Sequence, residues 1–502
     1  MNAHPPEPTT KGVPPRVPTS PAPRFFLRLL AGLLVYTAFL FALRLGGPPN
    51  LTDNDQERPA SYVLDALVHG QWIVQRDWTG DITSKPPAYT WLAALASLLL
   101  GGPSLGALYL PCALALFGTA ALVAWIASRY LGHRAALISC AFLLANPLSA
   151  KLVALARTDP LFTFTVTLTA VLAFQAWKTG SGWTLAWLAA AFATLTKGPL
   201  GLVLGFAGLF AWFWERRQGA RSPFARGHVP GFLLWIALCG GWFGLAWLSA
   251  GDALVRKMLG AELVQHALGE PGAFPGTGLV LAPAYFLSRF IPWSLLSVAG
   301  LWMAIQRPES DPSSRQLQRF AASWLVVGLA VFGLAGHQRG DLIAPLMPAG
   351  ALLAAIPAAR WTAAWTWPRL VATCALVALA IGCGAQFQHT HRNTPIFQES
   401  TALSVLPSHF IRLGGNPGRL RPTDSPYALQ FHFGTHHPPL SWEAAARHLR
   451  ESPENSVAVV DRPALEQALG PDALRLRPLV SWPSAQGATG EVVRLEASGD
   501  VP

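Results

Sequence analysis

Charged residues are scarce in this 502-residue chain. Asp, Glu, Lys and Arg together make up 13% of it, against about 25% in ordinary soluble domains. Hydrophobic residues make up 52%, and the mean hydropathy is positive. So few charges cannot provide a water-facing surface over most of this length. The composition therefore excludes a string of ordinary soluble domains and indicates a protein that crosses a membrane several times.

Nucleotide-binding motifs and cysteine spacings that indicate a disulfide framework or a zinc site are also lacking. No G-x-G-x-x-G and no Walker motif occurs, so the sequence gives no sign of a soluble nucleotide-binding domain. The cysteines lie in apolar runs and show neither a disulfide framework nor a zinc-ligand spacing, so we expect buried thiols at Cys112, Cys140, Cys239, Cys374 and Cys383. Short alternating segments typical of membrane β-barrels are absent as well.

Long apolar runs are what the chain does have. Runs of about 20 residues match a hydrocarbon core about 30 Å thick. We predict an all-α polytopic membrane protein with about eleven spans, at residues 25–46, 104–128, 135–154, 160–177, 182–196, 199–214, 230–250, 278–305, 320–336, 341–358 and 369–386. The stretch 86–101 is shorter and begins with a Pro pair, so we expect a juxtamembrane or re-entrant helix there.

The chain has a formal net charge of +11, and the location of its basic residues indicates the membrane topology. In a membrane protein, basic residues gather in cytoplasmic loops, so we predict no nucleic-acid partner. Every second connection between predicted spans is basic, as shown by Arg129, Arg134, Lys178, Arg216, Arg217, Arg221, Arg226, Arg307, Arg315, Arg319, Arg360 and Arg369. This alternation predicts a cytoplasmic N-terminus and a periplasmic first loop at residues 47–103. It also predicts a periplasmic C-terminus.

Three regions follow from this pattern. Residues 1–24, rich in Pro and Thr, are predicted to be a disordered cytoplasmic tail, and residues 25–386 the transmembrane domain. Residues 387–502 are predicted to be a small periplasmic α/β domain, because NSVAVVDRPALEQALG indicates a strand, an acidic turn and an amphipathic helix. Its histidines match no established ligand spacing, so we interpret them as solvated and predict no metal at His389, His391, His432, His436 or His437.

Ionisable residues gather in the loops predicted to be periplasmic. Such residues are costly near the hydrocarbon unless they are paired or line a wet cavity, so we predict a polar cavity on this side. Cations would bind an anionic phosphate there, and a carboxylate would activate an acceptor. The candidates are Asp53, Asp55, Glu57, Arg58, Lys85, Arg157, Asp159, Lys197, His266, His337 and Arg339.

The order of these motifs carries a family resemblance. Asp55-x-x-Arg58 in an acidic loop is followed by Lys85-Pro-Pro, ARTDP, LTKGP and IAPLMPAGALLAA. Over about residues 25–360 the chain resembles the C-type glycosyltransferases, which use polyprenyl-phosphate sugars. The likeness is stronger to the lipid A aminoarabinose transferase and looser to the protein O-mannosyltransferases. Gln56, Pro59 and Ser84 depart from the usual family pattern.

The resemblance implies roles for particular residues. Asp55 falls on the catalytic carboxylate, with Asp53 as the competing assignment and an N-cap as the structural alternative for Asp55. Asp159 falls on a second acidic position. Lys85 falls on the lysine that approaches the donor phosphate, and the accompanying cations are Arg58, Arg157, Lys197 and Arg339. Glu57, His266 and His337 would line the site.

The implied function is sugar transfer, with inversion, from a polyprenyl-phosphate donor to a cell-envelope acceptor on the periplasmic face of a bacterial inner membrane. The acceptor stays open between a lipid A-like lipid or glycan and the Ser or Thr of a protein. We expect membrane lipids as further partners, no cofactor beyond the donor, and leave a divalent metal requirement open. A transporter or flippase is the alternative of another class, but the span pattern shows no repeated half.

Overall fold

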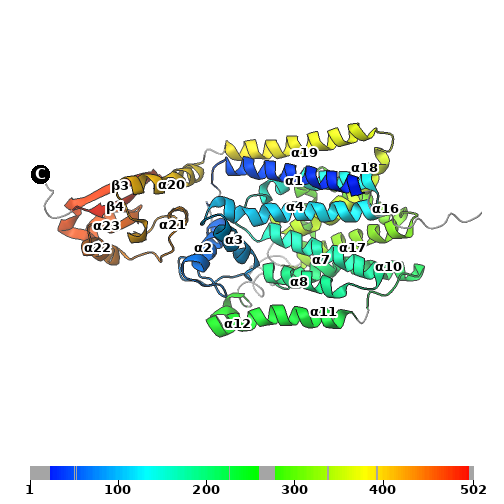
Figure 1. Cartoon of the computed structure of the whole chain (residues 1–502), viewed down its shortest axis with the longest axis horizontal. Coiled ribbons are helices and arrows are strands. Elements are labelled where there is room, and N and C mark those ends of the chain that lie inside the picture. The colour runs from blue at the N-terminus through cyan, green and yellow to red at the C-terminus, as the bar shows by residue number, and fades with distance from the viewer. Residues whose placement is uncertain are drawn as a thin grey trace, which may run out of the picture.

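The computed structural model describes residues 23–49, 51, 54–224, 227–258, 260, 277–335, 339–391 and 394–496. It shows a bundle of helices with a small α/β unit at one end (Figure 1). Three of the candidate site residues, Asp53, His266 and His337, lie outside the described residues, as does most of the predicted N-terminal tail.

Among the residues that the structure describes, seven helices are long and apolar enough to cross a membrane. They coincide with seven of the predicted spans. They are α1 (Pro23–Leu45), α4 (Leu105–Tyr130), α7 (Asp159–Thr179), α11 to α12 (His228–Trp235 and Gly241–Ala250, joined by η3, Ile236–Gly240), α17 (Pro312–Leu334), η5 with α18 (Gly340–Leu346 and Met347–Trp361) and α19 (Trp367–Thr390). The chain is therefore a multi-pass membrane protein.

The other four predicted spans form shorter or bent helices. They comprise α5 (His133–Leu144), α6 (Pro147–Leu152), α8 (Trp183–Lys197), α9 (Leu200–Phe206), η1 (Ala207–Ala211), α10 (Trp212–Glu215), η2 (Arg216–Gln218), α15 (Thr277–Arg289) and α16 (Trp293–Gln306). The pair α15 and α16 is bent by 119°. Hydropathy measures apolar length and does not register a helix break such as the one before Pro147, where Asn146 caps α6. The count of eleven spans therefore stays a prediction.

The first loop holds α2 (Asn54–Val68) and α3 (Ala88–Leu99), and α13 (Asp252–Leu254) follows α12. With 12 residues, α3 is too short to span the hydrocarbon, in line with the predicted juxtamembrane helix. Small residues let the bundle helices approach closely. At Gly300 a Cβ atom would lie 2.1 Å from the backbone oxygen of Leu353, so α16 can touch α18 only without a side chain there.

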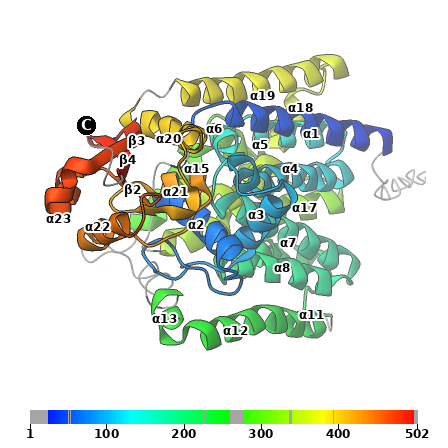
Figure 2. The same cartoon turned by 60° about the vertical axis from the view of Figure 1, so that its left-hand side comes forward.

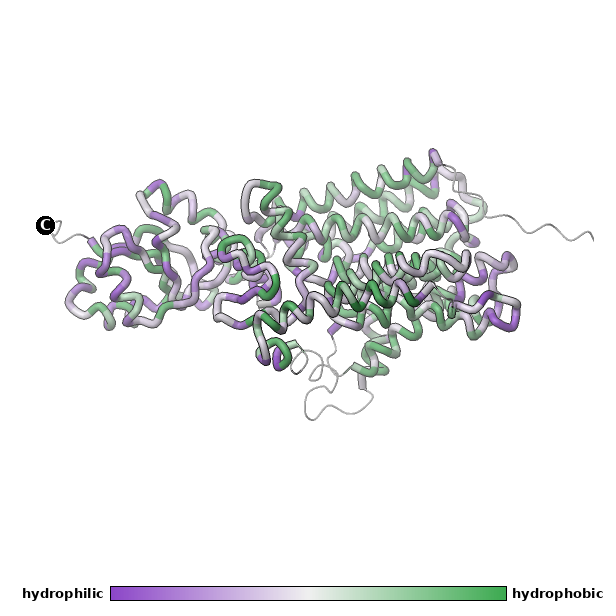
Figure 3. The backbone as a smooth tube through the Cα atoms, turned by 60° about the horizontal axis from the view of Figure 1, so that its bottom comes forward, coloured by the Kyte–Doolittle hydropathy of each residue, from purple (hydrophilic) through white to green (hydrophobic). Residues whose placement is uncertain are grey.

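The connections with basic residues meet at one end of the bundle. Glu215 accepts hydrogen bonds from Arg315 and Arg319, and Arg360 donates to Glu309 at 2.6 Å. The α/β unit lies beyond the opposite end, on the same side as α2 and α3 (Figure 1). Hydrophilic residues concentrate at these two ends, and the bundle between them is mostly hydrophobic (Figure 3). The predicted grouping of connections therefore holds in the structure, and which end faces the cytoplasm stays a prediction.

The C-terminal unit follows α19. Its elements are α20 (Pro395–Arg412), η6 (Pro417–Arg419), β1 (Leu420–Pro422), α21 (Tyr427–Phe433), α22 (Trp442–Glu451), β2 (Ser456–Val459), α23 (Arg462–Leu469), η7 (Gly470–Arg475), β3 (Leu476–Pro483) and β4 (Thr489–Leu495). The sheet order is β1-β2-β4-β3, with β1 parallel to β2 and the other pairs antiparallel. The predicted strand, acidic turn and helix are confirmed as β2, Asp461 and α23. Asp461 caps α23 by accepting from the backbone N–H of Ala464.

The C-terminal unit contacts the first loop. Helix α21 packs on α2, and the two lie side by side in both views (Figures 1 and 2). The ring of Tyr427 stacks on Trp78 with centroids 4.6 Å apart. These contacts place the unit next to the loop that carries Asp55.

Candidate active site

Asp55 lies in the first turn of α2 and faces two arginines from distant parts of the chain. Its Oδ2 accepts a hydrogen bond of 2.6 Å from Nη2 of Arg339 and lies 3.9 Å from Nη2 of Arg157. Because α2 begins at Asn54, Asp55 is inside the first turn. Its carboxylate is engaged by side chains from other elements, as a site residue requires.

The electrostatic environment keeps Asp55 ionised. Partial burial by itself would raise the pKa of this carboxyl, but the hydrogen bond from Arg339 and the charges of Arg157, Arg339 and Lys85 together hold the pKa below its ordinary value. The hydrogen bond to Asp55 raises the pKa of Arg339 in turn. At neutral pH the site therefore holds a carboxylate among cations.

Arg157 connects three carboxylates. Its Nε lies 3.0 Å from Oδ2 of Asp159, its Nη1 lies 3.6 Å from Oδ2 of Asp341, and Asp55 is the third. Only 12% of the Arg157 side chain is exposed. A planar guanidinium has donors in several directions, which suits this bridging position.

Asp159 and Lys197 form an ion pair between the ends of two helices. Asp159 is the first residue of α7, and Lys197 is the last residue of α8 and donates to Oδ1 of Asp159. Gly198 then adopts φ +85°, a conformation that favours glycine, and turns the chain away directly after Lys197. The sequences ARTDP and TKGP thus place both charges at the same end of the bundle.

Lys85 approaches this cluster without a carboxylate partner of its own. Among the residues that the structure describes, no carboxylate oxygen lies within 4.0 Å of its Nζ. Lys85 nevertheless interacts electrostatically with both Asp55 and Asp159. Its backbone is fixed by Thr83, whose hydroxyl donates to the Lys85 carbonyl at 2.9 Å. A half-buried cation in this position suits an anionic ligand.

Two candidates from the first loop have other partners. Nε of Arg58 lies 3.4 Å from Oδ2 of Asp77, and no ion pair within the described ranges joins it to the Asp55 cluster. Glu57 accepts a hydrogen bond of 3.2 Å from the backbone N–H of Ala428 and so faces the C-terminal unit. The structure thus brings together six predicted residues, namely Asp55, Lys85, Arg157, Asp159, Lys197 and Arg339.

One ion pair beside this cluster has no counterpart among the predicted site residues. Nζ of Lys151 lies 2.7 Å from Oδ2 of Asp341, the carboxylate that also contacts Arg157. Lys151 was inside a predicted span, so hydropathy gave no sign of a site residue there. Asp341, two residues after Arg339 and at the start of a helix, was the available signal.

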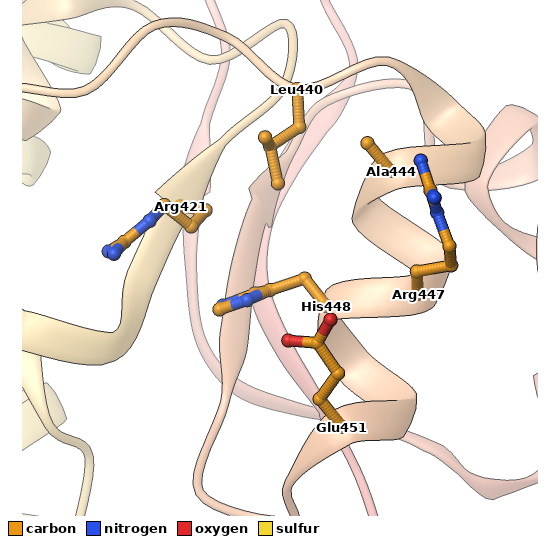
Figure 4. Close-up of a pocket in the computed structure, with 6 residues that line it drawn as sticks. All are labelled: Arg421, Leu440, Ala444, Arg447, His448 and Glu451. Atoms are coloured by element: carbon orange, nitrogen blue, oxygen red, sulfur yellow. The ribbon is translucent and has the colours of Figure 1, made fainter.

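Two cavities lined by described residues lie elsewhere in the molecule. One of about 250 Å³ lies in the C-terminal unit and is lined by Arg421, Leu440, Ala444, Arg447, His448 and Glu451. Its charged residues come from β1 and α22, and the Arg421 guanidinium points away from α22 (Figure 4). The other, of about 220 Å³, lies between the first loop and the C-terminal unit, where Glu57 and Asp424 contribute to its wall. Both are separate from the Asp55 cluster.

Comparison with known proteins identifies the fold. Residues 84–243 match the dolichyl-phosphate-mannose-protein mannosyltransferase family. The crystal structure of ArnT from Cupriavidus metallidurans bound to undecaprenyl phosphate is similar with a TM-score of 0.69 at 16% identity, covering 96% of this chain and 100% of that one. The chain therefore shares the fold of this ArnT structure. The resemblance inferred from the motif order is confirmed.

Curated proteins that are similar in sequence come from two Pseudomonas species. The undecaprenyl phosphate-α-4-amino-4-deoxy-L-arabinose arabinosyl transferases of Pseudomonas paraeruginosa and Pseudomonas aeruginosa are each 28% identical over 304 residues, or 59% of this chain. The match covers 52% of each relative, so the chain spans about half the length of the curated relatives it matches. The segment that matches the mannosyltransferase family includes Lys85, Arg157, Asp159 and Lys197.

Proposed function

We propose that the protein is a membrane glycosyltransferase. It transfers a sugar from a polyprenyl-phosphate donor to a cell-envelope acceptor on the periplasmic face of a bacterial inner membrane. The observation that carries the proposal is the cluster of Lys85, Arg157 and Arg339 around Asp55 at one end of the bundle. The names of the relatives, and the undecaprenyl phosphate bound in the Cupriavidus metallidurans structure, support this donor class.

The transfer reaction requires two tasks of the charged residues, namely stabilising the departing phosphate and assisting the acceptor. A polyprenyl phosphate becomes a better leaving group when cations neutralise the charge that develops on it as the glycosidic bond breaks. Lys85 supplies this cation, because it has no carboxylate partner within the described residues, and Arg157 and Arg339 extend the positive region. No general acid is then needed for the departing phosphate.

Asp55 serves the acceptor. With a hydroxyl acceptor it takes the proton while the oxygen attacks the anomeric carbon from the face opposite the phosphate, so the configuration is inverted. With a phosphate acceptor, which is already ionised, the carboxylate orients the nucleophile. The lowered pKa of Asp55 keeps it in the ionised form that both tasks require.

The favoured acceptor is a lipid A-like lipid or another envelope glycan, because the motif order resembles that of the lipid A aminoarabinose transferase. A protein acceptor is the second candidate, because the family that matches residues 84–243 is described as a protein mannosyltransferase. The two differ only in the group that meets Asp55, so the same donor site serves either.

The experiment is a product assay with full-length protein in detergent. It is incubated with undecaprenyl-phosphate sugars, among them 4-amino-4-deoxy-L-arabinose, and with lipid A or a Ser/Thr-rich peptide, and products are read by mass spectrometry. Asp55→Asn should lower product formation by about 10²- to 10⁴-fold. Asp81→Asn is the matched control, because Asp81 lies in the same loop but pairs with Lys257 at 2.8 Å. Absence of transfer from every donor, together with lipid movement across vesicles, would favour the flippase instead.

A further inference from the structure

We propose that Asp65, His69 and His436 form a Zn²⁺ site that joins the first loop to the C-terminal unit. Asp65 lies in α2, His69 directly follows this helix, and His436 follows α21. Oδ1 of Asp65 is 2.9 Å from Nδ1 of His69 and 3.9 Å from Nε2 of His436. This inference goes beyond the proposed transfer reaction and does not depend on it.

The spacing of the three ligand atoms suits a tetrahedral metal. All three lie within 4.8 Å of one another. Zinc binds imidazole nitrogen and carboxylate oxygen at about 2.0–2.1 Å, which puts neighbouring ligand atoms about 3.4 Å apart in a tetrahedron. The observed separations of 2.9 and 3.9 Å lie on either side of this value. Small rotations of the side chains are enough to place an ion between them.

Each buried ligand is held by a second hydrogen bond on its far side. Oδ2 of Asp65 accepts from the backbone N–H of Arg76 at 2.6 Å, which leaves Oδ1 for the metal. Nδ1 of His436 lies 3.0 Å from the Tyr427 hydroxyl. With Nδ1 as the donor, Nε2, which lies 3.9 Å from Oδ1 of Asp65, carries the lone pair that binds a metal. Metal-binding histidines characteristically have such an outer partner, which fixes the tautomer and the ring orientation.

The surroundings also fix the position of His436. The Tyr427 ring stacks on Trp78 of the first loop, 4.6 Å away. The side-chain amide of Gln430 accepts from the backbone N–H of His437 at 2.7 Å and donates to its carbonyl at 3.0 Å. On the other side of His436, the backbone N–H of Thr435 donates to the Gln430 carbonyl at 3.0 Å, so the loop after α21 is held on both sides of His436. Preorganisation of this kind is what a metal site needs.

The exposure of His69 leaves one side of the proposed site accessible to solvent. Asp65 and His436 are buried, whereas the His69 side chain is 42% exposed. Three protein ligands and one open side leave room for a water as the fourth ligand. Two imidazoles and one carboxylate favour zinc over the oxygen-seeking Mg²⁺ and Ca²⁺.

A bound ion would fasten the C-terminal unit to α2. The C-terminal unit also contacts the first loop through the Trp78–Tyr427 stack, and it contacts α2 through the hydrogen bond from Ala428 to Glu57. Asp55 lies on the same helix as Asp65, so a fixed position of the C-terminal unit also defines the space outside the Asp55 cluster. The sequence spacing of His432, His436 and His437 could not indicate this site, because its carboxylate comes from the first loop.

The test is metal binding by the full-length protein in detergent, with any affinity tag removed and the metal stripped by a chelator. Titration with Zn²⁺ should show one equivalent bound per chain, and Co²⁺ should give the absorption bands of a tetrahedral site. Zn²⁺ should raise the unfolding temperature of the native chain. His69→Ala and His436→Ala should each lose the tight equivalent and the cobalt spectrum. His409→Ala, an exposed histidine in α20, is the control that should keep both.

Tyr427→Phe tests the outer partner without removing a ligand. It keeps the ring that stacks on Trp78 and should weaken Zn²⁺ binding by about ten- to a hundredfold. The exposed His69 can be replaced without opening a buried cavity, so a folded His69→Ala protein keeps the test decisive. If the native chain binds no Zn²⁺, or if His69→Ala and His436→Ala bind it as the native chain does, the proposed site is refuted.

Discussion

Asp55 and Arg339 form a hydrogen-bonded ion pair of 2.6 Å although 284 residues separate them in the chain. Their side chains are 44% and 42% exposed, so solvent screens the pair and its contribution to stability is small. Lowering the pKa of the carboxyl is its more significant effect. The pair therefore relates to chemistry at the end of the bundle more than to folding.

Asp55→Asn is expected to lower the transfer rate by about 10²- to 10⁴-fold, the usual contribution of a positioned proton acceptor. The amide keeps the size of the side chain and its place in the first turn of α2. The unfolding temperature should therefore stay within the range of Asp81→Asn, the control from the same loop. Single-turnover transfer with saturating acceptor measures the effect. A near-native rate would shift the assignment to Asp159 or to Asp53.

The pH dependence of transfer should reflect the Arg339–Asp55 pair. The pKa of Asp55 lies below its ordinary value, so the carboxylate stays ionised on acidification until the pH falls below this lowered pKa. The transfer rate should stay constant down to the same pH. Arg339→Gln removes a charge and alters the hydrogen bond, so the pKa of Asp55 should rise and the acidic fall in rate should move to higher pH. Superimposable pH–rate profiles for the two proteins would contradict this.

The sequence predicts the long apolar helices because hydropathy depends only on composition over a window. Spans such as α4 and α17 were located from this signal alone. The break between α5 and α6, and the 119° bend between α15 and α16, depend on local backbone geometry at prolines that hydropathy averages away. The short helix at 88–99 could be predicted because its length falls below what a span requires.

Motif order likewise selected part of the site. Asp55, Lys85 and Asp159 came from the family resemblance, and the structure brings them within electrostatic reach of one another. The motif order could not select Lys151, an isolated charge in an apolar run, or predict its pairing with Asp341. Nor could it find the cluster of Asp65 with His436, because contacts between the first loop and the C-terminal unit exist only in the folded chain.

Lys85→Met is expected to weaken use of the donor. A hydrogen bond to a charged group contributes about 1.5–3 kcal/mol, which corresponds to a fall in kcat/KM for the donor of about ten- to a hundredfold. Arg58→Met is the informative comparison, because Arg58 pairs with Asp77 and is 46% exposed. If Arg58 and Lys85 both contact the phosphate, both variants should lower kcat/KM for the donor. A kcat/KM for the donor that is unchanged in Lys85→Met would remove Lys85 from the site.

Membrane topology can be tested with reporter fusions at positions 222 and 450. Ser222 belongs to the basic connection before α11, and Arg450 lies in α22 of the C-terminal unit. Positive charge favours the cytoplasm, so we expect a cytoplasmic reporter signal at 222 and a periplasmic one at 450. The same compartment for both would reject the predicted orientation and with it the periplasmic location of Asp55.

The pair of Asp159 and Lys197 should matter for stability as well as for the site. Their side chains are only 6% and 15% exposed, so replacing one partner leaves the other charge buried and uncompensated. Asp159→Asn or Lys197→Met is therefore expected to lower the free energy of unfolding by about 3–5 kcal/mol. The double variant removes both charges and should recover a large part of this loss.

Arg157, 3.0 Å from Asp159, would remain without that partner in the double variant, so recovery should be incomplete. Thermal unfolding in detergent of the native chain, both single variants and the double variant gives the coupling between the two residues. Additive losses in the double variant would show that the two charges do not depend on each other, and the ion pair would then have no part in holding α7 and α8 together.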